Sequence, residues 1–128
     1  MKKIIGFCVI IILSGLFVHA AAAPVLTPAQ ARQYAAYTRY DDVVAFLSRL
    51  QSLDPRIKVY AVGKTLENAS DDRVGRDILC CVVSDPQRKG DKLLVQLQAS
   101  HHGNEQSGPD ALQQLLAGIA EKKLDYLL

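Results

Sequence analysis

The sequence predicts an α/β protein. Two amphipathic helical patterns flank three short apolar runs, and turn residues separate them in the order helix, strand, strand, strand, loop, helix. The chain has 128 residues, of which 49% are apolar and 22% charged, so it fits one ordinary globular domain.

The first 22 residues have the organisation of a secretory signal peptide. Two lysines follow Met1, residues 4–18 form an almost unbroken apolar run, and alanines at 20–23 supply small residues for cleavage. The run of about 15 residues is shorter than the roughly 20 that a membrane span needs. We therefore expect a signal peptide at residues 1–22 and a domain at 23–128. The location is expected to be secreted or periplasmic, with no stable membrane anchor after cleavage.

The charge balance of the expected mature chain is neutral. Cleavage removes two lysines and leaves 13 basic groups against 13 acidic ones. Binding to nucleic acid or to an anionic membrane surface usually requires an excess of lysine and arginine, and the expected mature chain has no such excess. We expect no nucleic-acid partner.

Two helices are predicted before the first strand. Thr27 and Pro28 are a capping residue and a proline at the first helical position, which predicts a short helix over residues 29–37. Thr38 and Asp41 have capping-box spacing. An i, i+3, i+4, i+7 apolar stripe follows and predicts an amphipathic helix that ends before an Asp-Pro pair: Val43, Phe46, Leu47 and Leu50.

Three apolar runs predict strands. Residues 57–62 are rich in β-branched side chains. Residues 78–83 are apolar throughout, which is typical of a central strand covered on both faces. Residues 93–97 place alternate apolar side chains on one face. We expect free, buried thiols at Cys80 and Cys81, because strand neighbours point to opposite faces and a disulfide between them would be strained.

A second clear helix is predicted from Gly108-Pro109-Asp110 onward. Its apolar stripe is expected to be buried, and two lysines suit its negative end. The stripe consists of Leu112, Leu115, Leu116 and Ile119.

The polar loop before this helix carries candidate metal ligands. It reads His101-His102-Gly103-Asn104-Glu105 and lies where a strand's carboxyl end meets a helix, the place where open α/β sheets build ligand sites. Imidazole and carboxylate are good zinc ligands, and catalytic zinc typically takes three protein ligands and one water. Side chains three residues apart can reach the same point. From the residues alone, a metal site at His102 and Glu105 and a solvated polar loop both remain open.

Four blocks of the sequence resemble the zinc carboxypeptidases, the metallocarboxypeptidase family. In order they are a Tyr-x-x-Tyr-Asp helix start, a Gly-Lys-Thr-x-Glu turn, a Gly-Arg entering a strand, and His-x-x-Glu with a glycine three residues on. Here they begin at Tyr37, Gly63, Gly75 and His102 and span residues 37–120. Residues 68–74 depart from the pattern and look like an insertion.

The resemblance implies the N-terminal part of a mixed-sheet domain with helices on both faces. It implies a Zn²⁺-dependent hydrolase, a protease that removes C-terminal residues from peptide or protein substrates with a free C-terminus. His102 and Glu105 would be the first two zinc ligands, with His101 beside them as a neighbouring group or a solvent-facing one.

The same resemblance implies that part of the site lies elsewhere. No histidine follows His102 and no arginine follows Arg88, so the third zinc ligand and the carboxylate-binding arginine are missing from this chain. Glu67 and Glu121 do not match the family's general base, which is expected beyond Leu128. We therefore expect an N-terminal fragment that is inactive alone.

Three alternatives remain. One is a relative that trims cell-wall peptides, and another is the related deacylase branch, against which the Tyr-x-x-Tyr and Gly-Lys-Thr-x-Glu blocks argue. The third is a secreted binding domain that kept the fold and lost the chemistry.

Overall fold

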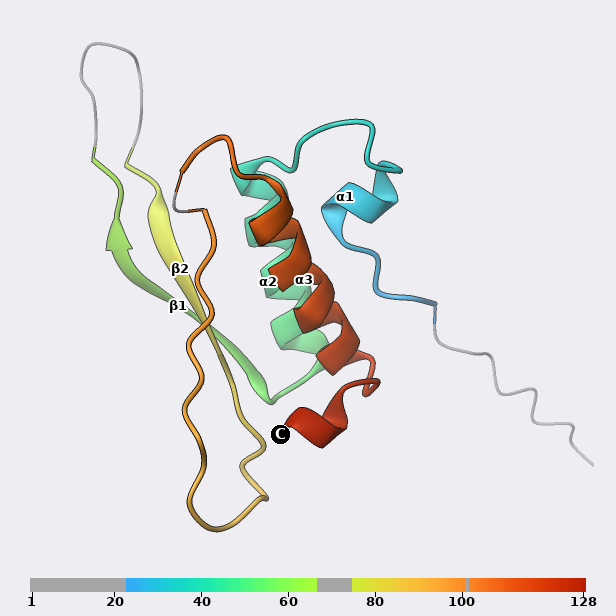
Figure 1. The fold of residues 1–128 in the computed structure, drawn as a ribbon, viewed down its shortest axis with the longest axis vertical. Helices are drawn as coiled ribbons and strands as arrows, with labels where there is room; N and C mark the ends of the chain where they lie inside the picture. Colours follow the sequence, from blue (N-terminus) through green and yellow to red (C-terminus); the bar gives the residue numbers. More distant parts are fainter. Residues whose placement is uncertain (1–22, 67–74, 101) are drawn as a thin grey trace, which may run out of the picture.

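The computed structural model describes residues 23–66, 75–100 and 102–128. In chain order the elements are α1 (Pro28–Ala31), α2 (Tyr40–Leu53), β1 (Ile57–Lys64), β2 (Asp77–Val83), α3 (Ser107–Ala120) and the 3-10 helix η1 (Asp125–Leu127). Figure 1 shows α2 and α3 side by side on one side of the β1–β2 hairpin. The α/β class is confirmed as helices with a two-stranded antiparallel sheet. The predicted signal peptide, residues 1–22, lies outside the described residues.

The first helix is shorter than the sequence predicts. The Thr27 hydroxyl accepts the Gln30 N–H at 3.2 Å, and the Gln30 side chain accepts the Thr27 N–H at 3.0 Å. The helix ends after one turn because Gln33 and Tyr34 have left-handed backbones, with φ of 54° and 59°. A right-handed helix cannot continue through that conformation. The predicted helix over residues 29–37 is therefore wrong beyond its first turn.

The second helix, α2, forms where the apolar stripe predicts it, but with a different cap. The Asp42 carboxylate accepts the Arg39 N–H at 3.0 Å, so Asp42 takes the role that capping-box spacing predicts for Asp41. Thr38, the predicted capping residue, instead donates its hydroxyl to α3. Arg32 holds Asp42 with two hydrogen bonds of 2.8 Å and is the main cause of the lowered pKa of this carboxyl. The stripe packs inward as predicted, with three buried residues: Phe46, Leu47 and Leu50.

The hairpin is covered by helices on one face. Tyr60 lies opposite Cys80 in the antiparallel register, and the side chains that alternate with them pack on the core: Ile57, Val59, Leu79, Cys81 and Val83. The other face is about half exposed, with Tyr60 at 52% and Val82 at 48%. Helices on both faces were expected; among the described residues, helices cover one face. The reason is that α2 and α3 share a single core, which covers the Ile57 face.

The second strand, β2, is an edge strand among the described residues, not the predicted central one, because only β1 pairs with it there. Cys80 and Cys81 are free thiols, as predicted, but each is only partly buried. Cys81 faces the core, and burial raises the pKa of its thiol, with a smaller contribution from Cys80.

The third predicted strand, residues 93–97, is wrong: the structure has an extended segment without strand pairing, drawn in Figure 1 as a trace with no arrow. Leu93 and Leu94 are 89% and 93% exposed. Alternation gives a segment the tendency to form a strand, but a strand also needs a hydrogen-bonding partner and a covered face. The described residues supply neither at this position.

The last α-helix, α3, starts beside the Gly-Pro-Asp signal, as predicted, but its buried face is rotated. Gln113, Ala117 and Ile119 are buried, whereas three residues of the predicted stripe are only partly covered: Leu112, Leu115 and Leu116. An apolar stripe spans a wide arc of a helix, and here Ala117 and Ile119 enter the core while Leu115 and Leu116 pack against its edge.

A buried carboxylate joins the ends of α2 and α3 to the start of β1. Asp54 has no exposed surface and accepts hydrogen bonds from backbone and guanidinium N–H groups of Arg56 at 2.7–3.1 Å. It also accepts one from the Lys122 ammonium at 2.9 Å. Arg56 in turn donates to the Ile119 carbonyl at 3.1 Å and pairs with Asp125 at 2.8 Å. The hydrogen bonds from Arg56, and then that from Lys122, hold the pKa of Asp54 far below its usual range.

Asp54→Asn should therefore lower the free energy of unfolding by about 3 kcal/mol. This is the low end for breaking a buried ion pair, because Arg56 keeps Asp125 as a counter-ion. Asp91→Asn makes the same change at an exposed position and should stay within about 0.5 kcal/mol of the wild type. Chemical denaturation measures both. Equal stability of the two variants would contradict the assignment.

The contribution of Asp54 should also disappear in acid. Its folded pKa lies below the ordinary 3.8, so ionised Asp54 stabilises the fold above that pH, and the stabilisation is lost as the pH falls toward the folded pKa. We expect the stability gap between wild type and Asp54→Asn to be constant above about pH 5 and to shrink below pH 3.8. Denaturation curves collected from pH 7 to pH 2 test this, and a gap that stays constant to pH 2 would show that the carboxylate is not the cause.

Candidate metal centre

The loop that precedes α3 is placed by a close contact and a turn. Ser100 has a left-handed backbone, with φ of 62°, where the chain enters the loop. A Cβ added at Gly108 would lie 3.3 Å from the Ala99 side chain, so the glycine allows the incoming segment to approach the first turn of α3. The Glu105 N–H donates to the His102 carbonyl at 3.2 Å and closes the turn. The loop is thereby attached to the amino end of a 14-residue helix.

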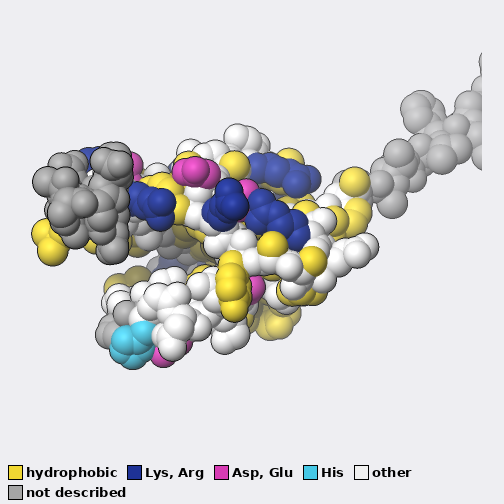
Figure 2. Space-filling model, turned by 90° about the horizontal axis from the view of Figure 1, so that it is seen from above, with side chains coloured by type: hydrophobic (Ala, Val, Ile, Leu, Met, Phe, Trp, Pro, Cys, Tyr) yellow, Lys and Arg dark blue, Asp and Glu magenta, His cyan; other side chains and the backbone are white. Residues whose placement is uncertain are grey.

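The two predicted zinc ligands lie together in this turn. His102 Nδ1 is 2.7 Å from Glu105 Oε1, and the His102 N–H donates to Glu105 Oε2 over a longer distance of 3.4 Å. Their side chains are 69% and 52% exposed. Figure 2 shows the one histidine in the described residues at the surface, next to an acidic side chain. The prediction that these two residues can reach the same point is confirmed.

The donor chemistry of the pair fits two positions of a zinc ion. Zinc binds histidine nitrogen and carboxylate oxygen at about 2.0–2.2 Å in tetrahedral geometry, which separates two ligand atoms by about 3.3 Å. The nitrogen and oxygen are now 2.7 Å apart and would need to separate by only about half an ångström, and both side chains are exposed. Within the described residues, no group of three or more His, Cys, Asp or Glu side chains converges on one point. His101, the predicted neighbour of the pair, lies outside those residues.

The other acidic candidates do not join the loop. Glu67 lies outside the described residues. Glu121 lies past the far end of α3, about 20 Å along a helix of this length. It accepts the Val25 N–H at 2.8 Å and pairs with Lys123 at 2.7 Å. The hydrogen bond from Lys123 is the main cause of the lowered pKa of Glu121, and the bond from the Val25 N–H is the next. This carboxylate therefore accepts hydrogen bonds that hold the fold together.

The structure adds one residue that the sequence did not single out. The side-chain amide of Gln106 donates to the Gly103 carbonyl at 3.1 Å, inside the turn that carries the two candidate ligands. A glutamine directly before a helix start is a common polar residue, and its hydrogen-bond partner is visible only in the folded loop.

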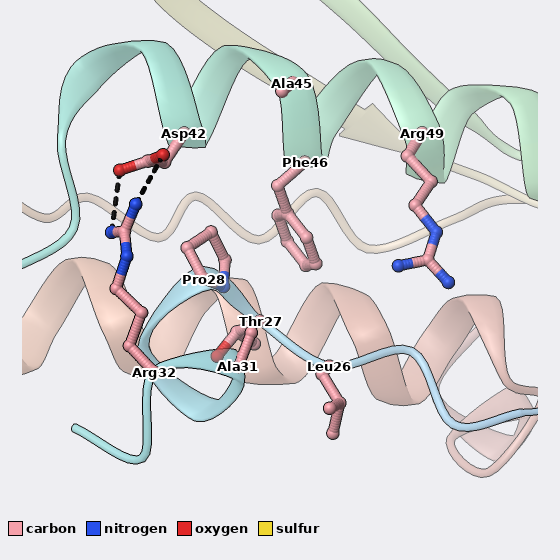
Figure 3. Close-up of a pocket in the computed structure, with 9 residues that line it drawn as sticks. All are labelled: Leu26, Thr27, Pro28, Ala31, Arg32, Asp42, Ala45, Phe46 and Arg49. Atoms are coloured by element: carbon pink, nitrogen blue, oxygen red, sulfur yellow. Dashed lines mark hydrogen bonds and ion pairs between the residues drawn. The ribbon is translucent and has the colours of Figure 1, made fainter. Parts of the chain in front are cut away.

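An open cavity of about 310 Å³ lies away from this loop, between α1 and α2. Figure 3 shows Phe46 and Arg49 reaching from α2 toward the segment before α1, and Arg32 held by Asp42 across the cavity. None of the lining residues belongs to the loop before α3, so this cavity is separate from the candidate metal ligands. It is lined by Leu26, Thr27, Pro28, Ala31, Arg32, Asp42, Ala45, Phe46 and Arg49.

No protein-family model, curated protein or solved structure matches this chain.

None of the helices in residues 23–66, 75–100 and 102–128 combines the length and apolar character needed to cross a membrane.

Zinc should bind the protein through His102 Nδ1, because that nitrogen faces Glu105. Addition of Zn²⁺ to ¹⁵N-labelled chain should shift the His102 Nδ1 resonance more than Nε2. His102→Ala or Glu105→Gln should weaken binding by more than about tenfold, since even loss of a group outside the ligand set can cost that much. Asn104→Ala, an exposed substitution between the two, is the control. A shift confined to Nε2, or full affinity in Glu105→Gln, would contradict the assignment.

Proposed function

We propose that this chain is the N-terminal part of an exported zinc metallocarboxypeptidase, which removes C-terminal residues from peptides. The observation that carries the proposal is the 2.7 Å approach of His102 Nδ1 and Glu105 Oε1 on a loop attached to the amino end of α3. The His-x-x-Glu spacing alone is weak evidence for a metal site, and this contact supports the proposal with geometry.

In this proposal His102 and Glu105 hold the metal. Zinc, when bound, polarises a substrate carbonyl and lowers the pKa of a bound water. The pair is exposed, so a peptide can reach an ion held there. The third ligand, the general base and the arginine that binds the substrate's terminal carboxylate come from residues beyond Leu128. A planar guanidinium can bind a carboxylate through two hydrogen bonds, which gives the substrate a defined orientation.

The exposed apolar surface supports a larger domain. One face of the hairpin is half exposed, and so is much of the segment that follows β2. These side chains include Tyr60, Val62, Ile78, Val82, Leu93, Leu94, Val95 and Leu97. Many large apolar side chains exposed on neighbouring segments often mark an area that another part of a protein covers. Further strands and helices of a mixed-sheet carboxypeptidase-like domain, with helices on both faces, would bury it.

A second candidate is a secreted binding domain without catalysis. It is favoured by one observation: within the described residues, the pair has no third His, Cys, Asp or Glu to complete a metal site. Relatives that trim cell-wall peptides or remove acyl groups would share the two ligands and differ in the missing half.

The test uses the gene product that continues past Leu128 and a peptide with a free C-terminus. We expect chelator-sensitive release of C-terminal residues. His102→Ala and Glu105→Gln should each lower kcat/KM at least about a hundredfold, because several kcal/mol of metal catalysis are lost. The 128-residue chain alone should be inactive.

The matched control is Glu121→Gln, which makes the same change at the far end of α3 and keeps an acceptor for the Val25 N–H. It should retain activity. Full chelator-sensitive activity in Glu105→Gln would overturn the zinc role. A coding sequence that continues without a further histidine and glutamate would favour the binding domain instead.

A further inference from the structure

We propose that Gln106 is a positioning residue that holds His102 and Glu105 in the geometry that binds metal; this rests on the zinc role in the proposed function. Its side-chain Nε2 donates to the Gly103 carbonyl at 3.1 Å, across the turn that separates the two ligands. Gln106 does not supply a metal ligand in this arrangement. It acts through the backbone between the two residues that do.

A constraint on the turn matters because the two ligand side chains lie at the surface. The side chains of His102 and Glu105 are both more than half exposed, so packing contributes little to their position. A Cβ placed at Gly103 would meet no atom within 4 Å, and a glycine between two ligands adds conformational freedom. The 2.7 Å contact between His102 Nδ1 and Glu105 Oε1 joins the two ligand atoms themselves and must open when an ion binds, whereas the bond from Gln106 to Gly103 lies in the backbone between them and can persist.

Gln106 is suited to this role because its own backbone is fixed to α3. It is the N-cap residue of that helix, it is partly buried, and its carbonyl accepts the Asp110 N–H at 3.2 Å. The helix therefore holds the glutamine, and the glutamine amide holds Gly103. Through this connection the rigid amino end of α3 limits the spread of an otherwise exposed turn.

A pre-ordered turn favours metal binding because less freedom is lost when the ion binds. The substitution Gln106→Met keeps the length of the side chain and removes the donor. We expect zinc affinity to fall about two- to tenfold, the range of one net hydrogen bond. The melting temperature of the metal-free chain should stay unchanged within error, because the bond lies in an exposed turn.

Rescue distinguishes positioning from a general structural effect. Gly103 lacks a positive φ and has open space around it, so Gly103→Ala is compatible with the turn and restricts its freedom. In the Gln106→Met background, Gly103→Ala should recover about two- to fivefold in affinity. It should have a smaller effect when Gln106 is present. Gln114→Ala, at an exposed glutamine on α3, is the control and should leave affinity unchanged.

The experiment is isothermal titration calorimetry of the 128-residue chain with Zn²⁺, together with the His102 Nδ1 resonance. Reduced affinity in Gln106→Met with recovery by Gly103→Ala supports the inference. If wild type and His102→Ala bind zinc equally, the proposed zinc role itself is wrong. If binding depends on His102 but Gln106→Met matches the wild type, the zinc pair stands and the positioning role is overturned.

Discussion

The arrangement of the helices and the hairpin depends on the buried carboxylate of Asp54. This one group accepts hydrogen bonds from Arg56 at the start of β1 and from Lys122 after α3, while its own backbone ends α2. A buried ion that loses its partners is strongly unfavourable, so the three chain segments can meet only in an arrangement that satisfies all of them. The apolar core beside it is small: Phe46, Leu47, Leu50, Ile57, Ala117 and Ile119. Apolar packing of this size is not directional, and the Asp54 network supplies the orientation.

The Asp54 network fixes one end of α3 and so helps to position the candidate metal loop before that helix. Arg56 holds the carboxyl end of the helix at Ile119, and Thr38 contacts Asp110 near the amino end. The helix between them is a stiff rod of about 20 Å, so fixing its two ends fixes where the preceding loop begins. Beyond that point the loop depends on its own hydrogen bonds, because its side chains are exposed. The buried Asp54 network and the two candidate metal ligands therefore lie at opposite ends of one helix.

The segment after β2 shows that a strand-like sequence does not by itself form a strand. Residues 93–97 have the composition and alternation of a strand, and among the described residues β2 pairs only with β1. Yet Leu93 and Leu94 are almost fully exposed. Burial and pairing must be supplied together for a strand to be stable, and a two-stranded hairpin offers little of either. This apolar surface is what a larger sheet would cover.

Local patterns in the sequence determined the elements whose causes lie within a few residues. The apolar stripe predicted α2, a β-branched run predicted β1 and a continuous apolar run predicted β2. The three-residue spacing predicted that His102 and Glu105 can meet. Only the tertiary structure determined the hydrogen-bond partner of each polar group. Arg32 binds Asp42, the residue that caps α2, and Asp54 is buried because partners distant in the sequence bind its carboxylate. Those outcomes could not be read from spacing because they compare contacts between residues far apart in the chain, and such contacts exist only once the helices and the hairpin have packed.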